Sequence, residues 1–363
     1  MKNTMRTMSF FSVNYIYILT AILTLLLEGL GSNIYAQDKL SSEQLKLTDM
    51  PLHDPFILAY KPTHTYYLYT TNVPAMTGDR QSGTMVYKSR DLLHWDKPKV
   101  VFIVPKDSWA DPDESPWAPE VHAWKGKFYL FTTLHNKNKI IAKPPKVWRT
   151  NIMRSTVIAV SDSPEGPFIL VKKDNPILPA NFMALDGTLY VDPDGQPWMV
   201  YAHEWIQKID GTMEAAPLND SLSKMAGKPI HLFKGSDAPW LNSTIKPSDF
   251  ELHYVTDGPE LYRTKDGHLL MLWSSWERGS YVQTVARSKT GKLQGPWEQL
   301  APLVKHDSGH GMLFRRFDGQ LMIVLHRPFR NARGKLYEMK DCGDHLEVIR
   351  ERIDLDGDAS EIK

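Results

Sequence analysis

The stretch that decides the fold is ALDGTLYVDPDGQPWMVYAHEW, residues Ala184–Trp205. Two runs rich in aromatic and aliphatic side chains, Thr188–Val191 and Trp198–Tyr201, flank the sequence Asp192-Pro193-Asp194-Gly195. Proline fixes φ and glycine accepts positive φ, so this sequence predicts a tight turn between two strands. Asp186 opens the first run, and a carboxylate there either caps a turn or points toward a site. Recurrence of the pattern decides between the two.

The pattern recurs four more times along the chain. Each copy pairs two apolar or aromatic runs across a short polar turn, at His53–Thr70, Trp117–Thr132, Val255–Trp273 and Gly309–Leu325. Five hairpins at intervals of roughly sixty residues are typical of radial β architectures.

A second pair of segments follows each hairpin. Thr84–Ser89 leads to Asp91–Trp95, Val157–Ser161 to Pro164–Phe168, and Val282–Ser288 to Leu293–Trp297, with weaker versions around Met213–Pro229 and Leu336–Ile349. Each unit is therefore predicted to have four strands, the fourth entered through a turn and an aromatic side chain. The prediction is an all-β fold, a five-bladed β-propeller with four-stranded blades around a central channel. A β-sandwich with fortuitous hairpins is the poorer alternative.

The length allows one large or two ordinary domains, and propellers often occupy such a length as one unit. The chain has 363 residues, of which 42% are hydrophobic, and a net charge of +1. This balance gives no indication of a nucleic-acid partner. Its 11 Trp, 15 Tyr and 13 Phe suit strands, and such rings also stack on sugars. The single cysteine, Cys342, excludes an internal disulfide and a paired-cysteine metal motif.

The N-terminus has the layout of a secretory signal peptide. Lys2 and Arg6 precede the apolar run Tyr15–Leu27, and a cleavage point follows Ala36. The run is shorter than the about 20 apolar residues that a membrane span needs, so an uncleaved anchor is the lesser alternative. We expect a signal peptide over 1–36 and a single propeller domain over 37–363. The protein is then secreted or periplasmic, with no stable membrane insertion after cleavage.

Ionisable residues stand at the start of nearly every first strand. In a propeller these strands line the channel, and their first residues gather at one of its mouths. The residues concerned are Asp54, Glu120, Asp186, Asp257 or Glu260, and His310. A single one would be read as a turn cap. Five together favour a functional site.

The ordered set of short motifs at these positions resembles glycoside hydrolase family 43. The motifs are His53-Asp54-Pro55, Trp117-Ala118-Pro119-Glu120, Asp186, Thr256-Asp257-Gly258-Pro259 and Gly309-His310-Gly311, and the resemblance covers Pro51–Arg352. It implies an inverting glycosidase that cleaves α-L-arabinofuranosides, β-D-xylosides or, in some branches, galactosides of plant polysaccharides.

The resemblance also assigns roles to three carboxyl groups. Inversion needs a base that activates water and an acid that protonates the leaving oxygen, with the two carboxyls roughly 6.5–9.5 Å apart. By similarity Asp54 is the general base, and Asp186 raises the pKa of the acid and holds it in place.

The acid is the position at which this chain departs from the family. Family members usually have Thr-Glu-(Gly/Ala)-Pro, whereas this chain has Asp257, which is one methylene shorter. Glu260 follows three residues later. Alignment of the motif favours Asp257, with Glu260 as the alternative. Loss of catalysis, leaving a carbohydrate-binding propeller, is the third possibility.

Four further residues complete the expected site. Trp117 and Glu120 are expected to contact the sugar, and His53 adjoins the base. His310 resembles a histidine that, in parts of the family, lies beside a calcium ion or a water cluster in the channel. No cofactor is expected to be required. A structural calcium near His310 and a channel histidine without metal are both open, because no carboxylate cluster with calcium-loop spacing is present.

Overall fold

The computed structural model describes residues 44–142, 149–241 and 254–357. The chain divides into two compact units, Met1–Gln44 and Leu45–Lys363, and the description below concerns the second. The signal peptide expected over 1–36 lies outside the described residues. Within the described ranges, no helix is long and apolar enough to cross a membrane.

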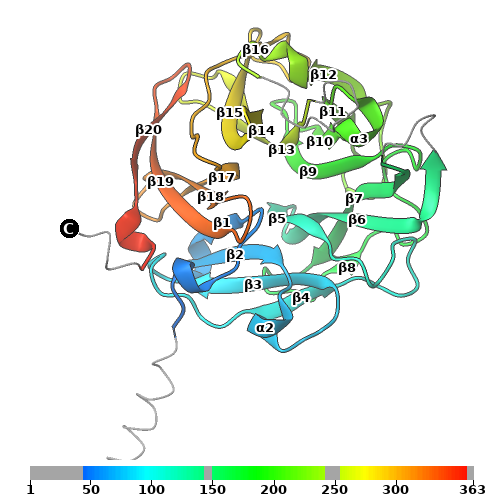
Figure 1. Cartoon of the computed structure of the whole chain (residues 1–363), viewed down its shortest axis with the longest axis horizontal. Helices are drawn as coiled ribbons and strands as arrows, with labels where there is room; N and C mark the ends of the chain where they lie inside the picture. Colours follow the sequence, from blue (N-terminus) through cyan, green and yellow to red (C-terminus); the bar gives the residue numbers. More distant parts are fainter. Residues whose placement is uncertain (1–43, 143–148, 242–253, 358–363) are drawn as a thin grey trace, which may run out of the picture. The chain divides into compact units, whose positions relative to one another are not determined.

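Five four-stranded antiparallel sheets form a ring, which confirms the predicted five-bladed propeller (Figure 1). Blade 1 contains β1 (Phe56–Tyr60), β2 (Thr65–Thr71), β3 (Gly83–Ser89) and β4 (Lys99–Ile103), and blade 2 contains β5 (Trp117–Trp124), β6 (Lys127–Ala142), β7 (Asn151–Ser161) and β8 (Ile169–Leu170). Blade 3 contains β9 (Ala184–Val191), β10 (Pro197–His203), β11 (Thr212–Pro217) and β12 (Ile230–Lys234). Blade 4 contains β13 (Asp257–Arg263), β14 (Leu269–Glu277), β15 (Ser280–Ser288) and β16 (Trp297–Gln299), and blade 5 contains β17 (Gly309–Arg315), β18 (Leu321–Arg327), β19 (Arg333–Asp341) and β20 (Leu346–Glu351).

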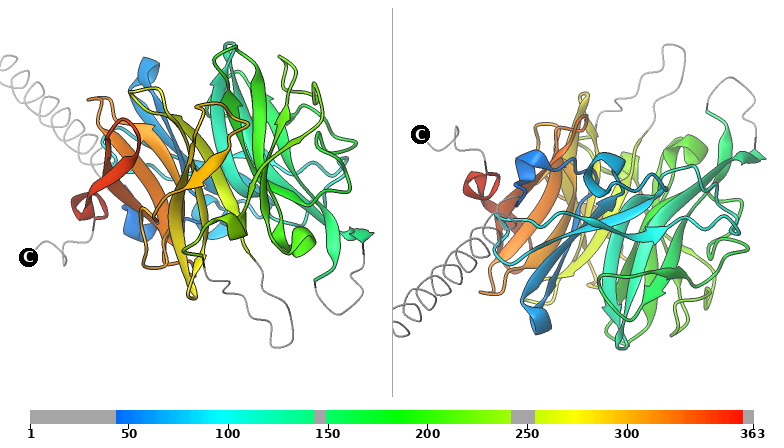
Figure 2. Two further views of the ribbon diagram at one scale, coloured as in Figure 1. Left: turned by 90° about the horizontal axis from the view of Figure 1, so that it is seen from above. Right: turned by 90° about the horizontal axis from the view of Figure 1, so that it is seen from below.

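Helical structure in the described ranges is short. There are two α-helices, α2 (Pro74–Thr77) and α3 (Trp205–Lys208), and four 3-10 turns, Leu47–Asp49, Lys61–Thr63, Gly235–Asp237 and Ile353–Leu355. The longest strand is β6, with 16 residues, and its far end projects at the rim of the ring (Figure 2).

In blades 1 and 2 the fourth strand begins after the turn and aromatic residue that were predicted to introduce it, and in blade 4 it begins at the aromatic residue itself, Trp297. In blade 1, Asp91 Oδ1 accepts the backbone N–H groups of Leu93 and His94 at 2.9 and 2.8 Å, which holds the chain in a turn. A short polar side chain that bonds to nearby backbone groups competes in this way with strand formation. Trp95 is fully buried, and its indole N–H donates to the Leu92 carbonyl. The strand then starts at Lys99.

The hydrophobic core lies between neighbouring blades, because each sheet is covered on both faces. Between blades 3 and 4, Phe233 packs against Trp273 with ring centroids 5.4 Å apart. One large cluster joins blades 1, 2 and 5, and it includes Leu68, Val121 and Met322. The innermost strands β1 and β17 lie side by side, so the first and fifth blades close the ring.

Candidate active site

Every blade bends its chain at an equivalent point near the start of the innermost strand. Asp54, Ala118, Asp186, Gly258 and His310 have φ values of 48°, 44°, 55°, 53° and 51°. In four of the blades the pairing register with the second strand also shifts at this point. Residues other than glycine rarely adopt positive φ, and such backbone strain is concentrated at functional sites. The repeated bend re-aims one residue of each blade at the mouth of the channel.

The predicted site residues fall into three sets relative to this bend. Asp54, Asp186 and His310 occupy the bend itself, and His53, Trp117 and Asp257 precede it by one residue. Glu120 and Glu260 follow it by two residues and therefore lie deeper along their strands. The structure thus gathers the first two sets at the mouth and places both glutamates one layer below.

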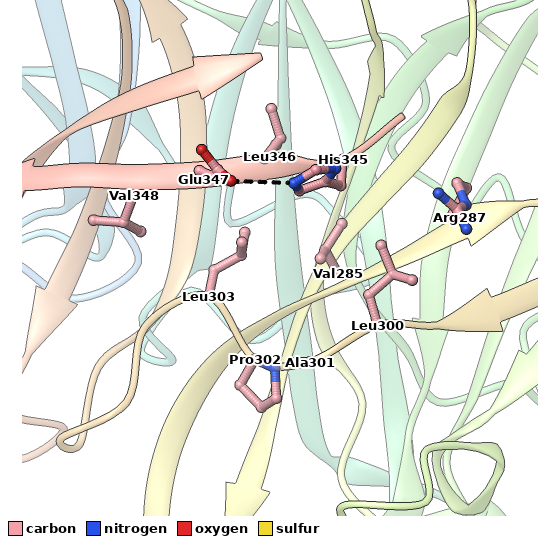
Figure 3. Close-up of a pocket in the computed structure, with 10 residues that line it drawn as sticks. All are labelled: Val285, Arg287, Leu300, Ala301, Pro302, Leu303, His345, Leu346, Glu347 and Val348. Carbon is pink, nitrogen blue, oxygen red and sulfur yellow. Dashed lines mark hydrogen bonds and ion pairs between the residues drawn. The ribbon is translucent and has the colours of Figure 1, made fainter. Parts of the chain in front are cut away.

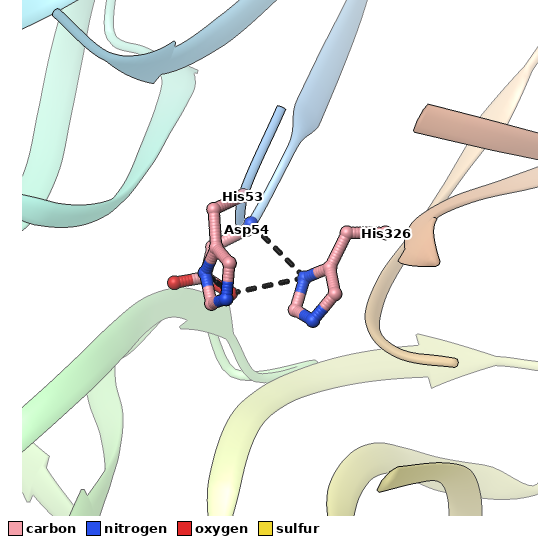
Figure 4. A group of neighbouring side chains, drawn as sticks. All are labelled: His53, Asp54 and His326. Carbon is pink, nitrogen blue, oxygen red and sulfur yellow. Dashed lines mark hydrogen bonds and ion pairs between the residues drawn. The ribbon is translucent and has the colours of Figure 1, made fainter. Parts of the chain in front are cut away.

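Asp54 lies among three histidines. Its Oδ1 is 3.1 Å from His310 Nδ1 and 3.0 Å from His53 Nδ1. The Nδ1 of His326, a residue from β18, accepts the Asp54 backbone N–H at 3.2 Å and lies 3.3 Å from Oδ1 (Figure 4). Burial alone would raise the pKa of Asp54, but the adjacent His310 and His53 hold that pKa well below its ordinary value. Asp54 is therefore ionised, as a general base must be.

Asp257 has the opposite electrostatic character. Burial raises the pKa of Asp257 to about 7. A hydrogen bond from the Tyr281 hydroxyl to Oδ2, 3.1 Å long, opposes the rise, and the negative charges of Asp54 and Glu204 add to it. A carboxyl group with this pKa carries a proton near neutral pH and is able to donate it.

Asp186 is buried beside Asp257. Its Oδ2 accepts the backbone N–H of Gly258 at 3.2 Å, and its own N–H donates to Thr133 Oγ1 at 2.9 Å. Burial raises the pKa of Asp186 well above its ordinary value, and repulsion from Asp257 and Asp54 raises it further. Two buried carboxyl groups in such proximity titrate as a pair, so the proton lost last belongs to the pair rather than to one residue.

Glu260 and Glu120 make contacts within the ring. Glu260 Oε2 accepts the backbone N–H of Leu313 in blade 5 at 2.7 Å. Burial raises the pKa of Glu260 well above its ordinary value. Glu120 is 2% exposed, and its Oε2 contacts His122 Nε2 at 2.9 Å, while its Oε1 finds no hydrogen-bond partner in the part of the chain that the structure describes. Glu260 is thus engaged with the next blade.

Trp117 presents an aromatic face at the mouth. Its side chain is 42% exposed, and the Arg154 guanidinium lies 4.6 Å from the ring centroid. Arg154 in turn donates to His135 Nδ1 at 2.8 Å and to both carboxylate oxygens of Glu204 at 2.5 Å. Although exposed, the Trp117 ring is therefore fixed from behind by a buried ion pair.

Tyr281 is a site residue that the sequence patterns did not single out. Its ring stacks on His326 with centroids 5.5 Å apart and planes 4° from parallel. A Cβ on Gly309 would lie 2.5 Å from this ring, so only glycine leaves room for it there. Asp307 Oδ1 accepts the Tyr281 backbone N–H at 3.3 Å. These contacts fix the hydroxyl opposite Asp257.

His326, Glu204 and Arg154 also escaped the sequence patterns. Each lies at the end of a second or third strand or just beyond it, whereas the repeated motif marks only first strands. A carboxylate just after β10 and a histidine near the end of β18 are the signals that would have identified Glu204 and His326.

A calcium ion near His310, which the sequence left open, would need most of its ligands from water. Calcium takes oxygen ligands, whereas His310 offers its Nε2, which is buried and has no hydrogen-bond partner among the described residues. Among the described residues, no group of three His, Cys, Asp or Glu side chains within reach of one ion includes His310. The group at this mouth that could hold an ion is His53, Asp54 and His326 (Figure 4).

Fold and site together define a five-bladed propeller with a cluster of buried carboxyl groups at one mouth of its channel. The chain belongs to the family described as glycosyl hydrolases family 43, whose profile matches residues 48–346.

Three proteins illustrate the likeness. The crystal structure of an endo-arabinase from Bacteroides thetaiotaomicron is 36% identical, with a TM-score of 0.71, over 82% of this chain and 96% of that one. An extracellular endo-α-(1→5)-L-arabinanase of Bacillus subtilis is 27% identical over 49% of this chain and 52% of its own length. An extracellular exo-α-(1→5)-L-arabinofuranosidase of Cellvibrio japonicus is 23% identical over 48% of this chain and 46% of its own length. The match spans about half the length of these curated relatives.

Proposed function

We propose that this protein is a secreted glycosidase that hydrolyses α-L-arabinofuranosyl linkages in plant polysaccharides with inversion. The observation that carries the proposal is the electrostatic contrast at the channel mouth. The pKa of Asp54 lies well below its ordinary value, while that of Asp257 is raised to about 7. One carboxylate is thus poised to accept a proton and one carboxylic acid to donate one.

In the proposed reaction, Asp54 removes a proton from a water molecule as that water attacks the anomeric carbon. Asp257 delivers its proton to the glycosidic oxygen as the bond to the leaving sugar breaks. Afterwards Asp54 carries a proton and Asp257 is ionised. Exchange with solvent restores both groups, and the side chain of Asp54 is 15% exposed for that purpose.

Asp186 is proposed to position the acid and to favour its protonated form. The hydrogen bond that it accepts from Gly258 N–H fixes the residue next to Asp257. Because a negative charge on either carboxyl disfavours ionisation of the other, the pair keeps one proton at neutral pH. Glu204 adds a further negative charge that acts on Asp257.

The proposed substrate class is arabinan. The relatives reported above are named as arabinanases or an arabinofuranosidase, and one of them is 36% identical over nearly its whole length. Resemblance to the wider family leaves β-D-xylosides and galactosides as alternatives. The test incubates the purified full chain with debranched arabinan, xylan and galactan and follows soluble products by chromatography. Arabinose or arabino-oligosaccharides are expected, and turnover of xylan or galactan without arabinan would overturn the substrate class.

A carbohydrate-binding propeller without catalysis is the second candidate. The observation that favours it is the acid position, where Asp257 is one methylene shorter than the glutamate usual in the family. This candidate predicts retention of the protein on an arabinan affinity gel together with no reducing ends released. Release of reducing ends that is lost in Asp257→Asn would exclude it.

Secretion through residues 1–36 is part of the proposal. It is supported by the relatives, which are named extracellular. N-terminal sequencing of the exported protein should begin at Gln37, and a mature chain that retains the apolar run Tyr15–Leu27 would contradict the proposal.

A calcium ion in the channel is proposed only as a structural ion that catalysis does not require. An ion there would be bound through His310 Nε2 and water, and it would supply positive charge near Asp54. Dialysis against a chelator should then lower the melting temperature, and added calcium should restore it. An unchanged melting temperature would leave His310 as a channel histidine that acts on Asp54 alone.

A further inference from the structure

We propose that Cys342, His345 and Glu347 form a binding site for a thiophilic divalent cation of the zinc class. The three residues lie in and beside the hairpin between β19 and β20, on the outer edge of blade 5. One ligand atom from each side chain lies within 4.8 Å of the others. Thiolate, imidazole and carboxylate are the side-chain ligands that zinc takes in proteins. The site is separate from the channel and from the proposed catalytic residues.

The histidine is oriented for metal binding by a carboxylate behind it. His345 Nε2 faces Glu347 Oε1 at 3.4 Å, while its other nitrogen, Nδ1, lies 2.6 Å from Asp344 Oδ1. When Nδ1–H donates to Asp344, the lone pair of Nε2 is directed toward Glu347. Metal-bound histidines are held by carboxylates in this way, which fixes the ring and its tautomer.

Asp344 is itself anchored to the neighbouring blade. Arg287, from β15, donates to Asp344 Oδ2 at 2.9 Å. The same Arg287 donates to Glu298 Oε2 at 2.9 Å, so its guanidinium is fixed between two carboxylates. Asp344, the carboxylate that supports His345, is therefore anchored to blade 4, whereas the three proposed ligands belong to blade 5.

The hairpin that carries the ligands is closed by backbone contacts. The N–H of Cys342 donates to the His345 carbonyl at 3.0 Å, and the N–H of Gly343 donates to Asp341 Oδ1 at 2.9 Å. Gly343 has a φ of 99°, a value that favours glycine. The Gly343 carbonyl also accepts a hydrogen bond from the Thr264 hydroxyl. A turn ordered before the metal arrives lowers the entropy lost on binding.

The side-chain ammonium group of Lys340 lies beside the proposed site. Lys340 Nζ contacts Glu347 Oε2 at 3.2 Å, which leaves Oε1 directed toward His345. Lys340 therefore competes with a metal ion for one oxygen of Glu347 and leaves the other oxygen available as a ligand. Binding of the metal releases the thiol proton to solvent.

A groove gives the ion access to the site. Figure 3 shows His345 and Glu347 side by side on one wall of the groove, which has a volume of about 620 Å³ and is also lined by Arg287 and Leu303. A zinc site with three protein ligands keeps a fourth position for water, and this open groove can supply it.

The test titrates the reduced, tag-free full chain with Zn²⁺ by calorimetry and with Co²⁺ by absorption spectroscopy. We expect binding of one equivalent that depends on Cys342, with a near-ultraviolet band from thiolate bound to cobalt. Cys342→Ser and His345→Gln should abolish that equivalent and the band. Asp344→Asn should weaken binding by about tenfold or more, because it frees the histidine ring. A second zinc at His53, Asp54 and His326 would persist in Cys342→Ser, so the band separates the two sites.

The matched control is His94→Gln. His94 Nδ1 contacts Asp91 Oδ2 at 2.7 Å on another surface turn, in an exposed histidine–carboxylate pair that has no thiol. This variant should bind the ions as the wild type does. Equal affinity in Cys342→Ser and in the wild type would overturn the proposal. So would failure of Zn²⁺ to protect Cys342 of the wild-type protein from a thiol reagent, a measurement that does not depend on any variant folding.

Discussion

The hydroxyl of Tyr281 donates a hydrogen bond to Asp257 Oδ2 at 3.1 Å, from the third strand of blade 4 to the first. This bond stabilises the ionised form of Asp257 and fixes the direction of its short side chain. In Tyr281→Phe we expect the pKa of Asp257 to rise, so the alkaline limb of the kcat/KM profile moves to higher pH. Loss of orientation should lower the maximum of the profile by about tenfold, since one hydrogen bond to a charged group contributes roughly 1.5 kcal/mol.

Tyr262→Phe is the control for this prediction. Tyr262 also donates to an aspartate, Asp341 of blade 5, at 2.8 Å, but it lies five residues further along β13 than Asp257. Its loss should leave the pH profile in place. An unshifted alkaline limb in Tyr281→Phe would show that the hydroxyl does not act on the acid.

The acid is assigned by comparing Asp257→Asn with Glu260→Gln on an unactivated arabino-oligosaccharide. Asp257→Asn should lower kcat by about 10²–10⁴-fold, because proton transfer to the leaving oxygen is lost. Aryl glycosides with good leaving groups should be affected far less. Glu260→Gln keeps an oxygen that can accept the Leu313 N–H, so its activity should stay close to that of the wild type. The reverse order of effects would assign the acid to Glu260.

The pH dependence of the free energy of unfolding should reveal the raised pKa of Asp257 independently of any activity measurement. Its pKa is raised from 3.8 to about 7, so the folded state binds a proton that the unfolded state has released across that interval. Stability contributed by this group is present below pH about 4 and is lost as pH rises toward about 7. Asp257→Asn lacks this loss. Its free energy of unfolding relative to the wild type should therefore grow by on the order of 1–3 kcal/mol between these pH values.

Denaturant unfolding of both proteins at several pH values measures that difference. A difference that stays constant from acid to neutral pH would mean that the pKa of Asp257 is not raised in the folded protein.

The buried Arg154–Glu204 pair should be costly to break at one end. Both side chains are nearly covered, with 10% and 4% exposed. Arg154→Met leaves the Glu204 carboxylate without its partner and should destabilise the protein by about 3 kcal/mol or more. It should also raise KM, because Trp117 loses the guanidinium behind its ring. Arg154→Met combined with Glu204→Gln should recover part of the stability, and a double variant as unstable as the sum of the two single variants would argue against a coupled pair.

The repeated hairpin made the ring predictable, because each copy carries a turn signal and apolar strands of similar length. The same repeat also located Asp54, Asp186 and Asp257 at one mouth. It did not show that Glu120 and Glu260 lie one layer deeper. That offset arises from the bend at positive φ, and in a sequence only a glycine indicates such a bend. Asp186 and His310 adopt this bend without any such signal.

The residues that surround the carboxyls could not be predicted from the first strands. Tyr281 meets Asp257 through the register of β13 with β14 and of β14 with β15, and His326 reaches Asp54 across the junction of blades 1 and 5. Partners of this kind are set by tertiary packing, with sequence separations such as 272 residues between Asp54 and His326. The opposite pKa shifts of Asp54 and Asp257 therefore become visible only in the folded protein.

The most direct test of the central claim is the kcat/KM of Asp54→Asn on an α-1,5-arabino-oligosaccharide. The assay should be run near pH about 6, where Asp257 is protonated. The wild type should release arabinose-containing products, and Asp54→Asn should be slower by about 10²–10⁴-fold, because the amide cannot accept a proton from the attacking water. Asparagine keeps the size of the side chain and its place among His53, His310 and His326. Equal kcat/KM in the variant and the wild type would contradict the assignment of Asp54 as the base and, with it, the proposed mechanism.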